Sequence, residues 1–214
     1  MADLGELKTC LIKGEKDMAR NLTQSLLDQG FGATEILDSG IVPAMDVVGE
    51  KFSKGEFYLP ELLISAKTMK ESLEVLKPYL EGRPNQNIAK VKILFGTVKG
   101  DLHDLGKNIV IMMLRGAGFE VKDLGIDVPP ERFLQELKRG DFQLCCMSAL
   151  LSTTMPELKR TIQSIKASGL RDKVKIMVGG APVTEAYARE AGADAYGKDA
   201  AEAVEKVREL MSKR

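Results

Sequence analysis

The sequence is poor in histidine, cysteine and tryptophan: its 214 residues include one histidine, three cysteines and no tryptophan. A zinc site needs three or four converging His, Cys or carboxylate ligands, so this inventory argues against one. Lysine and arginine together number 31, as do aspartate and glutamate, and this balance leaves no broad positive field for a nucleic-acid backbone. No nucleic-acid partner is therefore expected.

Long apolar runs are also absent. No run approaches the roughly 20 residues needed to cross a bilayer, and the acidic N-terminus lacks the apolar core of a signal peptide. Of the three cysteines, Cys145 and Cys146 are adjacent, and neighbours in a strand point to opposite faces, which makes them a poor disulfide pair. Buried thiols in a reducing compartment are the better interpretation, so we expect a cytoplasmic protein without a membrane partner.

Hydrophobic periodicity divides the chain into two halves. Up to about Leu80 the sequence shows only helical patterns, and their breaks predict an antiparallel bundle of four helices joined by short connections. The predicted helices span 5–13, 15–29, 33–53 with an interruption near 40, and 59–80. A polar, helix-breaking segment follows. We therefore expect a four-helix bundle cap domain at 1–81 and a linker at 82–88.

After the linker, strand-like and helical patterns alternate. The predicted strands span 90–98, 119–124, 142–148, 174–179 and 193–196. The predicted helices between them span 106–117, 130–139, 155–168, 184–191 and 199–212. Strict alternation indicates a parallel sheet covered by helices on both faces. Five strands favour a flavodoxin-like (Rossmann-type), doubly wound α/β domain over 89–214.

The single histidine, His103, follows the first predicted strand, at the sheet edge where open α/β sheets bind ligands. Asp101 can accept the second ring N–H, as partners of metal-ligating histidines do. Gly106 allows the next helix to begin close to whatever covers the loop. Ser148 ends the third strand and Gly179–Gly180 the fourth, so all lie at one edge. Each feature alone is commonplace, but together they predict a slot for a long ligand.

Other ligand classes lack their motifs. No G-x-G-x-x-G pattern follows the first strand, and Gly106-Lys107-Asn108 lacks the Ser or Thr that completes a phosphate loop. A receiver-type phosphorylation site would place an aspartate at the end of the third strand, where this chain has Met147-Ser148. A cofactor that brings its own equatorial ligands and takes one axial nitrogen from the protein fits better.

The motifs and their spacing resemble the cobalamin-binding signature. Asp101-x-His103-x-x-Gly106 is followed after 41 residues by Ser148-x-Leu150, and after 28 more by Gly179-Gly180. Upstream, Val48-Gly49-Glu50-Lys51-Phe52, Gly55 and Leu59-Pro60-Glu61-Leu62 resemble the helical cap of B12-dependent methionine synthase. They also resemble stand-alone corrinoid proteins of methylotrophic methanogens and acetogens. The resemblance covers nearly the whole chain.

The resemblance assigns a role to each matching position. His103 is expected to replace the cofactor's dimethylbenzimidazole as the lower axial ligand of cobalt, and Asp101 to hydrogen-bond that imidazole. This pair is the expected reactive centre. The hydroxyls expected to extend the relay are those of Ser152, Thr153 or Thr154.

The remaining positions are expected to contact the rest of the cofactor. Those expected to accommodate the loop and nucleotide tail are Asp104, Gly106, Ser148, Leu150, Gly179 and Gly180. Phe52 and Leu59 are expected to cover the upper face of the corrin. For Leu62 and Met69, core packing is the stronger interpretation.

The resemblance implies a methyl carrier that is not catalytic alone. One substrate-specific methyltransferase would load cobalamin, and a second would deliver the methyl group to a thiol or tetrahydrofolate-type acceptor, with a reductive activase as a further partner. The cap is expected to move about the linker when a partner docks.

Three alternatives differ in class. A carbon-skeleton mutase subunit has a similar histidine loop but lacks this cap. A B12-based sensor would add a DNA-binding helix-turn-helix and a Trp-bearing cap, and neither is found in the sequence. A cobalamin storage or delivery protein remains open.

Overall fold

The computed structural model describes residues 2–80 and 91–212. The chain divides into two compact units, Met1–Ala89 with Arg115–Gly118, and Lys90–Leu114 with Phe119–Arg214. We call them the helical unit and the sheet unit. The predicted linker at 82–88 lies outside the described residues, and the domain boundaries stay predictions. No helix in the described ranges is long and apolar enough to span a membrane.

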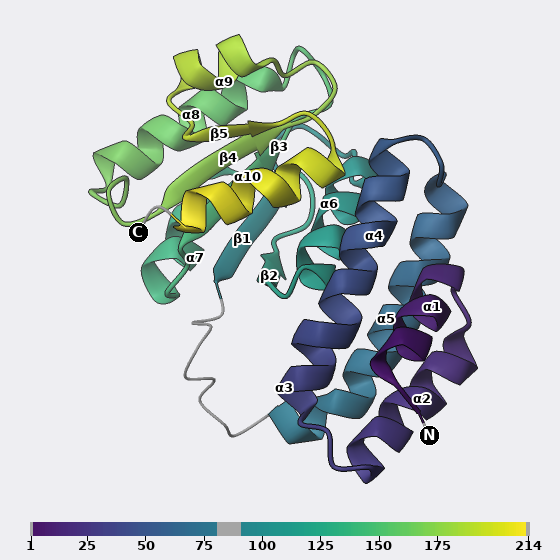
Figure 1. The fold of residues 1–214 in the computed structure, drawn as a ribbon. Coiled ribbons are helices and arrows are strands. Elements are labelled where there is room, and N and C mark those ends of the chain that lie inside the picture. Colours follow the sequence, from purple (N-terminus) through teal and green to yellow (C-terminus); the bar gives the residue numbers. More distant parts are fainter. Residues whose placement is uncertain (1, 81–90, 213–214) are drawn as a thin grey trace. The chain divides into compact units, whose positions relative to one another are not determined.

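Residues 4–80 form helices joined by short connections, as the periodicity predicts (Figure 1). The elements are α1 (Leu4–Lys13), α2 (Lys16–Asp28), α3 (Ala33–Ile36), the π-helical turn η1 (Leu37–Ile41), α4 (Val42–Ser53) and α5 (Leu59–Leu80). The interruption predicted near residue 40 is this π-helical turn. Pro43, in the first turn of α4, has no N–H to donate to a carbonyl of the preceding turn, which is a common reason for a helix to change its winding.

Leucine, isoleucine and valine side chains form the core of the helical unit. α5 packs against α2, and α1 packs against both α2 and α4. The largest fully buried side chains of this core are Leu7, Leu11, Leu26, Ile36, Ile41, Leu62 and Leu76. Met69 is also buried. Leu62 and Met69 are therefore core residues, in agreement with the core packing that their sequence positions favour.

The sheet unit contains five parallel strands in the order β2-β1-β3-β4-β5, which is the flavodoxin-like order. The strands are β1 (Lys92–Thr97), β2 (Glu120–Asp123), β3 (Leu144–Ser148), β4 (Lys175–Gly179) and β5 (Ala195–Gly197). The helices are α6 (Leu105–Gly116), α7 (Pro130–Arg139), α8 (Met155–Ala167), α9 (Glu185–Ala191) and α10 (Ala200–Ser212). The predicted fold class is confirmed.

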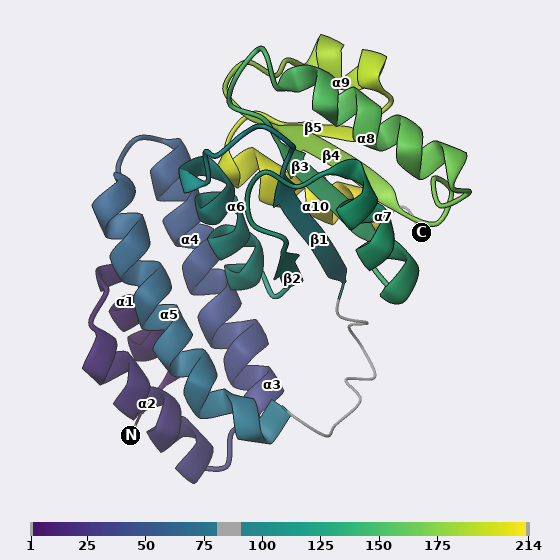
Figure 2. The same cartoon turned by 180° about the vertical axis from the view of Figure 1, so that it is seen from behind.

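Helices cover both faces of the sheet (Figures 1 and 2). α7, α8 and α9 cover one face, where Phe133, Leu158 and Ile162 pack against strand residues such as Leu94 and Val178. α6 and α10 cover the other. The carboxyl ends of all five strands meet at one edge, because the strands are parallel. Thr97 pairs with Ser148 in the register of β1 and β3, which places the loops after these strands side by side.

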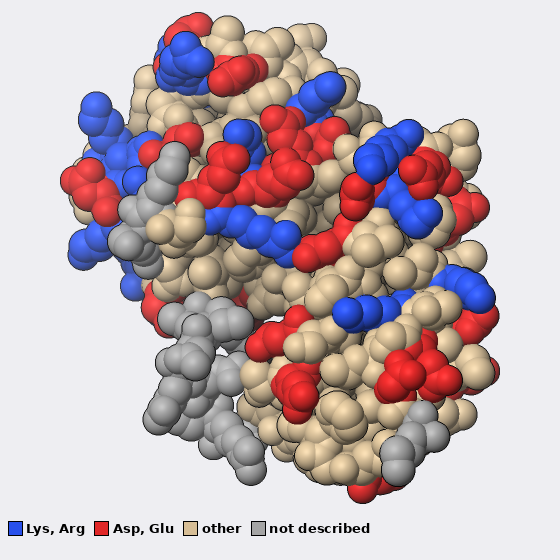
Figure 3. Space-filling view, in the orientation of Figure 1, with Lys and Arg blue, Asp and Glu red and all other residues tan. Residues whose placement is uncertain are grey.

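The cysteines and charges agree with the sequence analysis. Cys10, Cys145 and Cys146 are buried and unpaired. Burial raises the pKa of the Cys145 thiol to about 12, which keeps it protonated near neutral pH. Basic and acidic side chains are interspersed over each unit on the face that Figure 3 shows.

Candidate functional site

The loop between β1 and α6, residues 98–104, is arranged around the buried carboxylate of Asp101. We call this segment the His103 loop. Oδ1 of Asp101 accepts hydrogen bonds from the main-chain N–H of His103 at 3.1 Å and from its Nδ1 at 2.8 Å. Oδ2 accepts from Leu150 N at 2.7 Å, Leu151 N at 3.3 Å and Thr154 Oγ1 at 2.6 Å. Both carboxylate oxygens are thus occupied by donors.

These donors keep Asp101 ionised. Burial by itself raises the pKa of the Asp101 carboxyl, but the hydrogen bonds from Thr154, Leu150 and His103 together outweigh that effect. The result is a pKa well below the ordinary value of 3.8. An ionised carboxylate can only accept hydrogen bonds. Near neutral pH, the Nδ1 of His103 must therefore carry the hydrogen that lies between the two side chains.

The second ring nitrogen of His103 is consequently a free acceptor. In the neutral imidazole with hydrogen on Nδ1, Nε2 retains its lone pair and can ligate a metal. The side chain of His103 is 49 % exposed, so this nitrogen is accessible. No group of three His, Cys, Asp or Glu side chains within residues 2–80 and 91–212 could hold a bare metal ion. The loop therefore offers one oriented nitrogen to a metal that arrives with other ligands.

Exposed leucines lie on the His103 loop, at the start of α6 and just after the neighbouring strand β3. Leu102 and Leu105 flank His103 in the sequence, and Leu150 and Leu151 follow the neighbouring strand β3; all four side chains are exposed. At Gly106, a Cβ atom would meet nothing within 4 Å, so no part of the chain fills that space. These exposed leucines and the open space beside Gly106 suit a large, mostly apolar ligand.

Two further hydroxyls, those of Thr97 and Ser148, lie at the ends of β1 and β3, next to the His103 loop. Oγ1 of Thr97 is 3.0 Å from the carbonyl oxygen of His103 and 3.0 Å from Oγ of Ser148. Thr97 is buried and Ser148 half-buried. Ser148 was predicted from its position at the end of the third strand. Thr97 was not predicted, because only the strand pairing places its hydroxyl near the loop.

The glycine pair at the end of β4 is required by the chain's own packing. At Gly179 a Cβ would lie 2.8 Å from the carbonyl oxygen of Gly197. At Gly180, which has a φ of +123°, it would lie 1.9 Å from the carbonyl oxygen of Ala149. Close approach of the loops after β3, β4 and β5 accounts for both glycines. Contact with a nucleotide tail stays a prediction.

Two sets of contacts that sequence reasoning missed hold the middle of the His103 loop and the first turn of the helix that follows it. Asp127, whose φ of +51° is unusual for a residue other than glycine, accepts from Gly100 N at 2.7 Å. Its own N–H donates to the carbonyl oxygen of Asp101 at 3.0 Å. Lys107, in the first turn of α6, is buried against both carboxylate oxygens of Asp123 at the end of β2. No local motif signals these long-range contacts.

Of the three hydroxyls expected to extend the hydrogen bonding of His103 and Asp101, the structure brings one into contact with Asp101. Thr154 is buried and contacts Asp101 directly, whereas Ser152 and Thr153 are exposed. Asp104 is exposed and accepts from the side chain of Asn108 at 3.0 Å. Of the predicted residues, Asp101, His103, Ser148, Leu150 and Thr154 therefore lie around one centre.

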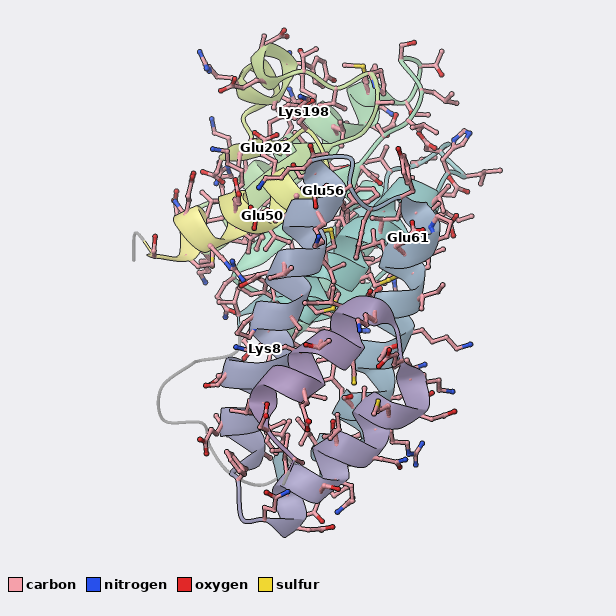
Figure 4. The ribbon with its side chains drawn as sticks, turned by 45° about the vertical axis from the view of Figure 1, so that its right-hand side comes forward. Lys8, Glu50, Glu56, Glu61, Lys198 and Glu202 are labelled. Atoms are coloured by element: carbon pink, nitrogen blue, oxygen red, sulfur yellow. The ribbon has the colours of Figure 1, made fainter. Side chains whose placement is uncertain are left out.

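Phe52 and Leu59 belong to the helical unit, at the end of α4 and the start of α5, and both are half-buried. Ion pairs of Lys51 with Glu56 at 3.0 Å and of Lys54 with Glu50 stabilise the turn between them. The Glu61 carboxylate accepts from Tyr58 N at 2.9 Å, which caps α5. Figure 4 labels these three glutamates at the same end of the unit. A role for Phe52 and Leu59 over a corrin stays a prediction.

Comparison with known proteins bears directly on this site. Two family models, each described as a B12 binding domain, match residues 91–205 and 4–77. The chain belongs to the B12-binding corrinoid protein family. Cobalamin is therefore the cofactor of this corrinoid protein, and a half-exposed imidazole oriented through its Nδ1 fits a corrinoid.

Individual relatives are similar to this chain over nearly its whole length. A trimethylamine corrinoid protein from Methanosarcina acetivorans is 38% identical over 97% of this chain and 96% of its own. A dimethylamine corrinoid protein from Methanosarcina barkeri is 40% identical over 98% and 97%. Among solved structures, the methanol:cobalamin methyltransferase complex MtaBC from Methanosarcina barkeri contains a chain with a TM-score of 0.86. That chain is 27% identical, over 97% of this chain and 79% of its own.

Proposed function

We propose that this corrinoid protein carries a methyl group on cobalamin between two methyltransferases, with His103 as the lower axial ligand of the base-off cofactor. The observation that carries the proposal is the hydrogen bond from Nδ1 of His103 to the buried carboxylate of Asp101. This bond leaves Nε2 as the nitrogen that can bind a metal. When bound, the cofactor supplies a cobalt centre that can hold a methyl group and give it up.

The residues of the loop have separate tasks in this proposal. Asp101 keeps the hydrogen on Nδ1, and it takes part in holding a proton when the imidazole leaves the metal. Thr154 and the main-chain N–H groups of Leu150 and Leu151 keep Asp101 ionised. The exposed leucines contact the macrocycle, while Ser148 and the neighbouring loops receive the nucleotide tail.

The names of relatives support a carrier role. Relatives at about 40% identity are named for methylamines, and one structural neighbour comes from a methanol methyltransferase complex. We infer that one substrate-specific methyltransferase loads this protein and that a second unloads it to a thiol or tetrahydrofolate-type acceptor. A reductive activase would restore the carrier after accidental oxidation.

The axial bond can be tested by spectroscopy. We expect the wild-type protein to bind cobalamin with the absorption spectrum of an imidazole-ligated, base-off form. His103→Ala should bind more weakly and lose the axial nitrogen that the protein supplies, because the sequence holds no other imidazole. Thermal unfolding of the cofactor-free variant checks that the fold is retained. A variant whose bound cofactor shows the wild-type spectrum would refute His103 as the ligand.

A second experiment separates a carrier from a store. The protein is loaded with methylcobalamin and mixed with a candidate methyltransferase and a thiol or tetrahydrofolate. Methylated acceptor should then form at a rate proportional to the methyltransferase concentration. The control omits the methyltransferase. Equal product with and without each of the methyltransferases encoded near this protein would support storage instead.

A further inference from the structure

The carbonyl oxygen of His103 is tied to the sheet by a residue outside the cofactor motif. Thr97 is the last residue of β1, and its hydroxyl lies 3.0 Å from that carbonyl oxygen. The side chain is buried, so this hydrogen bond is shielded from water. Thr97 thus holds the carbonyl of His103, in addition to the hydrogen bonds by which Asp101 holds the imidazole and the main-chain N–H of the same residue.

The hydrogens of the two hydroxyls can be assigned by counting. A hydroxyl has one hydrogen to donate, and a carbonyl oxygen can only accept. Thr97 therefore donates to His103, and Ser148 donates to Thr97 across their 3.0 Å separation. The reverse assignment would leave the carbonyl oxygen without this donor. The favoured arrangement connects the end of β3, through Thr97, to the main chain of His103.

We propose that Thr97 is a positioning residue for His103. Asp101 determines which ring nitrogen carries the hydrogen and accepts from the N–H of His103, whereas Thr97 holds the carbonyl group on the other side of the same residue. A metal–nitrogen bond is short and directional, so a small displacement of this main chain weakens it. This inference rests on His103 being the axial ligand.

Four variants separate positioning from simple structural support. Thr97→Val keeps the shape of the side chain but removes its hydroxyl, Thr97→Ser keeps the hydroxyl, and Thr97→Ala removes both methyl and hydroxyl. The matched control is Thr161→Val in α8, since Thr161 is also buried and donates to a main-chain carbonyl, that of Glu157, at 2.8 Å. Its hydroxyl contacts no residue of the His103 loop.

The readout is the axial nitrogen itself. Each variant is loaded with cobalamin, reduced to the paramagnetic Co(II) form, and measured by electron paramagnetic resonance for nitrogen splitting and by absorption. We expect Thr97→Val and Thr97→Ala to shift the equilibrium from bound to dissociated imidazole by roughly tenfold, the usual effect of one buried hydrogen bond. Thr97→Ser and Thr161→Val should retain the wild-type signal.

The outcomes are distinct. If Thr97→Val and Thr97→Ala lose stability as Thr161→Val does but keep the full nitrogen splitting, Thr97 is structural and the inference is wrong. Thr97→Ala decides the question if Thr97→Val does not fold. If the wild-type protein itself shows no imidazole splitting, the proposed axial bond fails, and the inference about Thr97 fails with it.

Discussion

The His103 loop and the glycine pair Gly179–Gly180 lie at the same edge of the sheet but are held by different means. The hydroxyl of Thr97, which donates, and the carboxylates of Asp101 and Asp127, which accept, fix the first through hydrogen bonds to its main chain. Close contact between main chains fixes the second, without any side chain at 179 or 180. Substituting a hydrogen-bonding side chain weakens one contact of the first loop. Adding a side chain at the glycine pair creates a clash that displaces the main chain.

This comparison predicts the largest loss of stability at Gly180. Gly180→Ala would place a Cβ 1.9 Å from the carbonyl oxygen of Ala149 at a φ of +123°. We expect a loss of roughly 3 kcal/mol or more in the free energy of unfolding, because both clash and backbone strain must be relieved. Denaturant unfolding measures this value.

The control for Gly180 is Gly169→Ala. Gly169 also has a positive φ, of +72°, but a Cβ there would meet nothing within 4 Å. It should cost only about 1–2 kcal/mol, the strain of a left-handed conformation. Equal losses at the two positions would show that strain, and not the contact with Ala149, fixes this edge.

Asp101→Asn should change the position of the His103 ring hydrogen and the binding of cobalamin more than the stability of the fold. Three donors face one side of residue 101, so the amide oxygen should turn toward Leu150, Leu151 and Thr154. Its NH₂ group then faces Nδ1 of His103, which must accept, and the ring hydrogen moves to Nε2. We expect cobalamin affinity to fall roughly 10- to 100-fold and the axial nitrogen splitting to disappear, although His103 is present.

The pH dependence of this variant follows from the lowered pKa of Asp101. A carboxyl whose pKa is lower in the folded state contributes stability above its unfolded pKa, and loses that contribution as pH falls toward the folded value. The difference in unfolding free energy between wild type and Asp101→Asn should therefore shrink as pH falls below the ordinary value of 3.8. Asp172→Asn, at an exposed carboxylate, is the control. A difference that grows on acidification would contradict the assignment.

The smallest expected effect is at Gly106, where the two kinds of constraint are both absent. Gly106→Ala lies in a helix with open space around its Cβ, so the cofactor-free protein should gain up to about 0.5–1 kcal/mol of stability. Cobalamin affinity should fall, because the methyl group occupies space beside the ligand. Calorimetry measures both quantities. Unchanged affinity would show that the cofactor does not approach Gly106.

The elements were predictable because the helices have a clear hydrophobic period and the central strands are short apolar runs between turn signals. β1, β3 and β4 are short apolar runs at the centre of the sheet, and each lies within the predicted range. The hydrogen bond from His103 to Asp101 was also predicted, since a spacing of two residues brings these side chains together.

Contacts between distant segments were harder to predict. Ser152, Thr153 and Thr154 are consecutive, and only the fold of the loop before α8 selects Thr154 as the partner of Asp101. The contact of Thr97 with the His103 loop depends on the register between β1 and β3, and the contact of Asp127 depends on the path of the loop after β2. The glycines at 179 and 180 were recognised, but the neighbour that requires them is the chain's own backbone.

The five donors that contact Asp101 have a consequence for how tightly the cofactor binds. Every one of them comes from the polypeptide, so the imidazole already has its orientation before any guest arrives. Little conformational entropy remains to be lost when the guest docks. Preorganisation of this kind favours binding of the cofactor at low concentration.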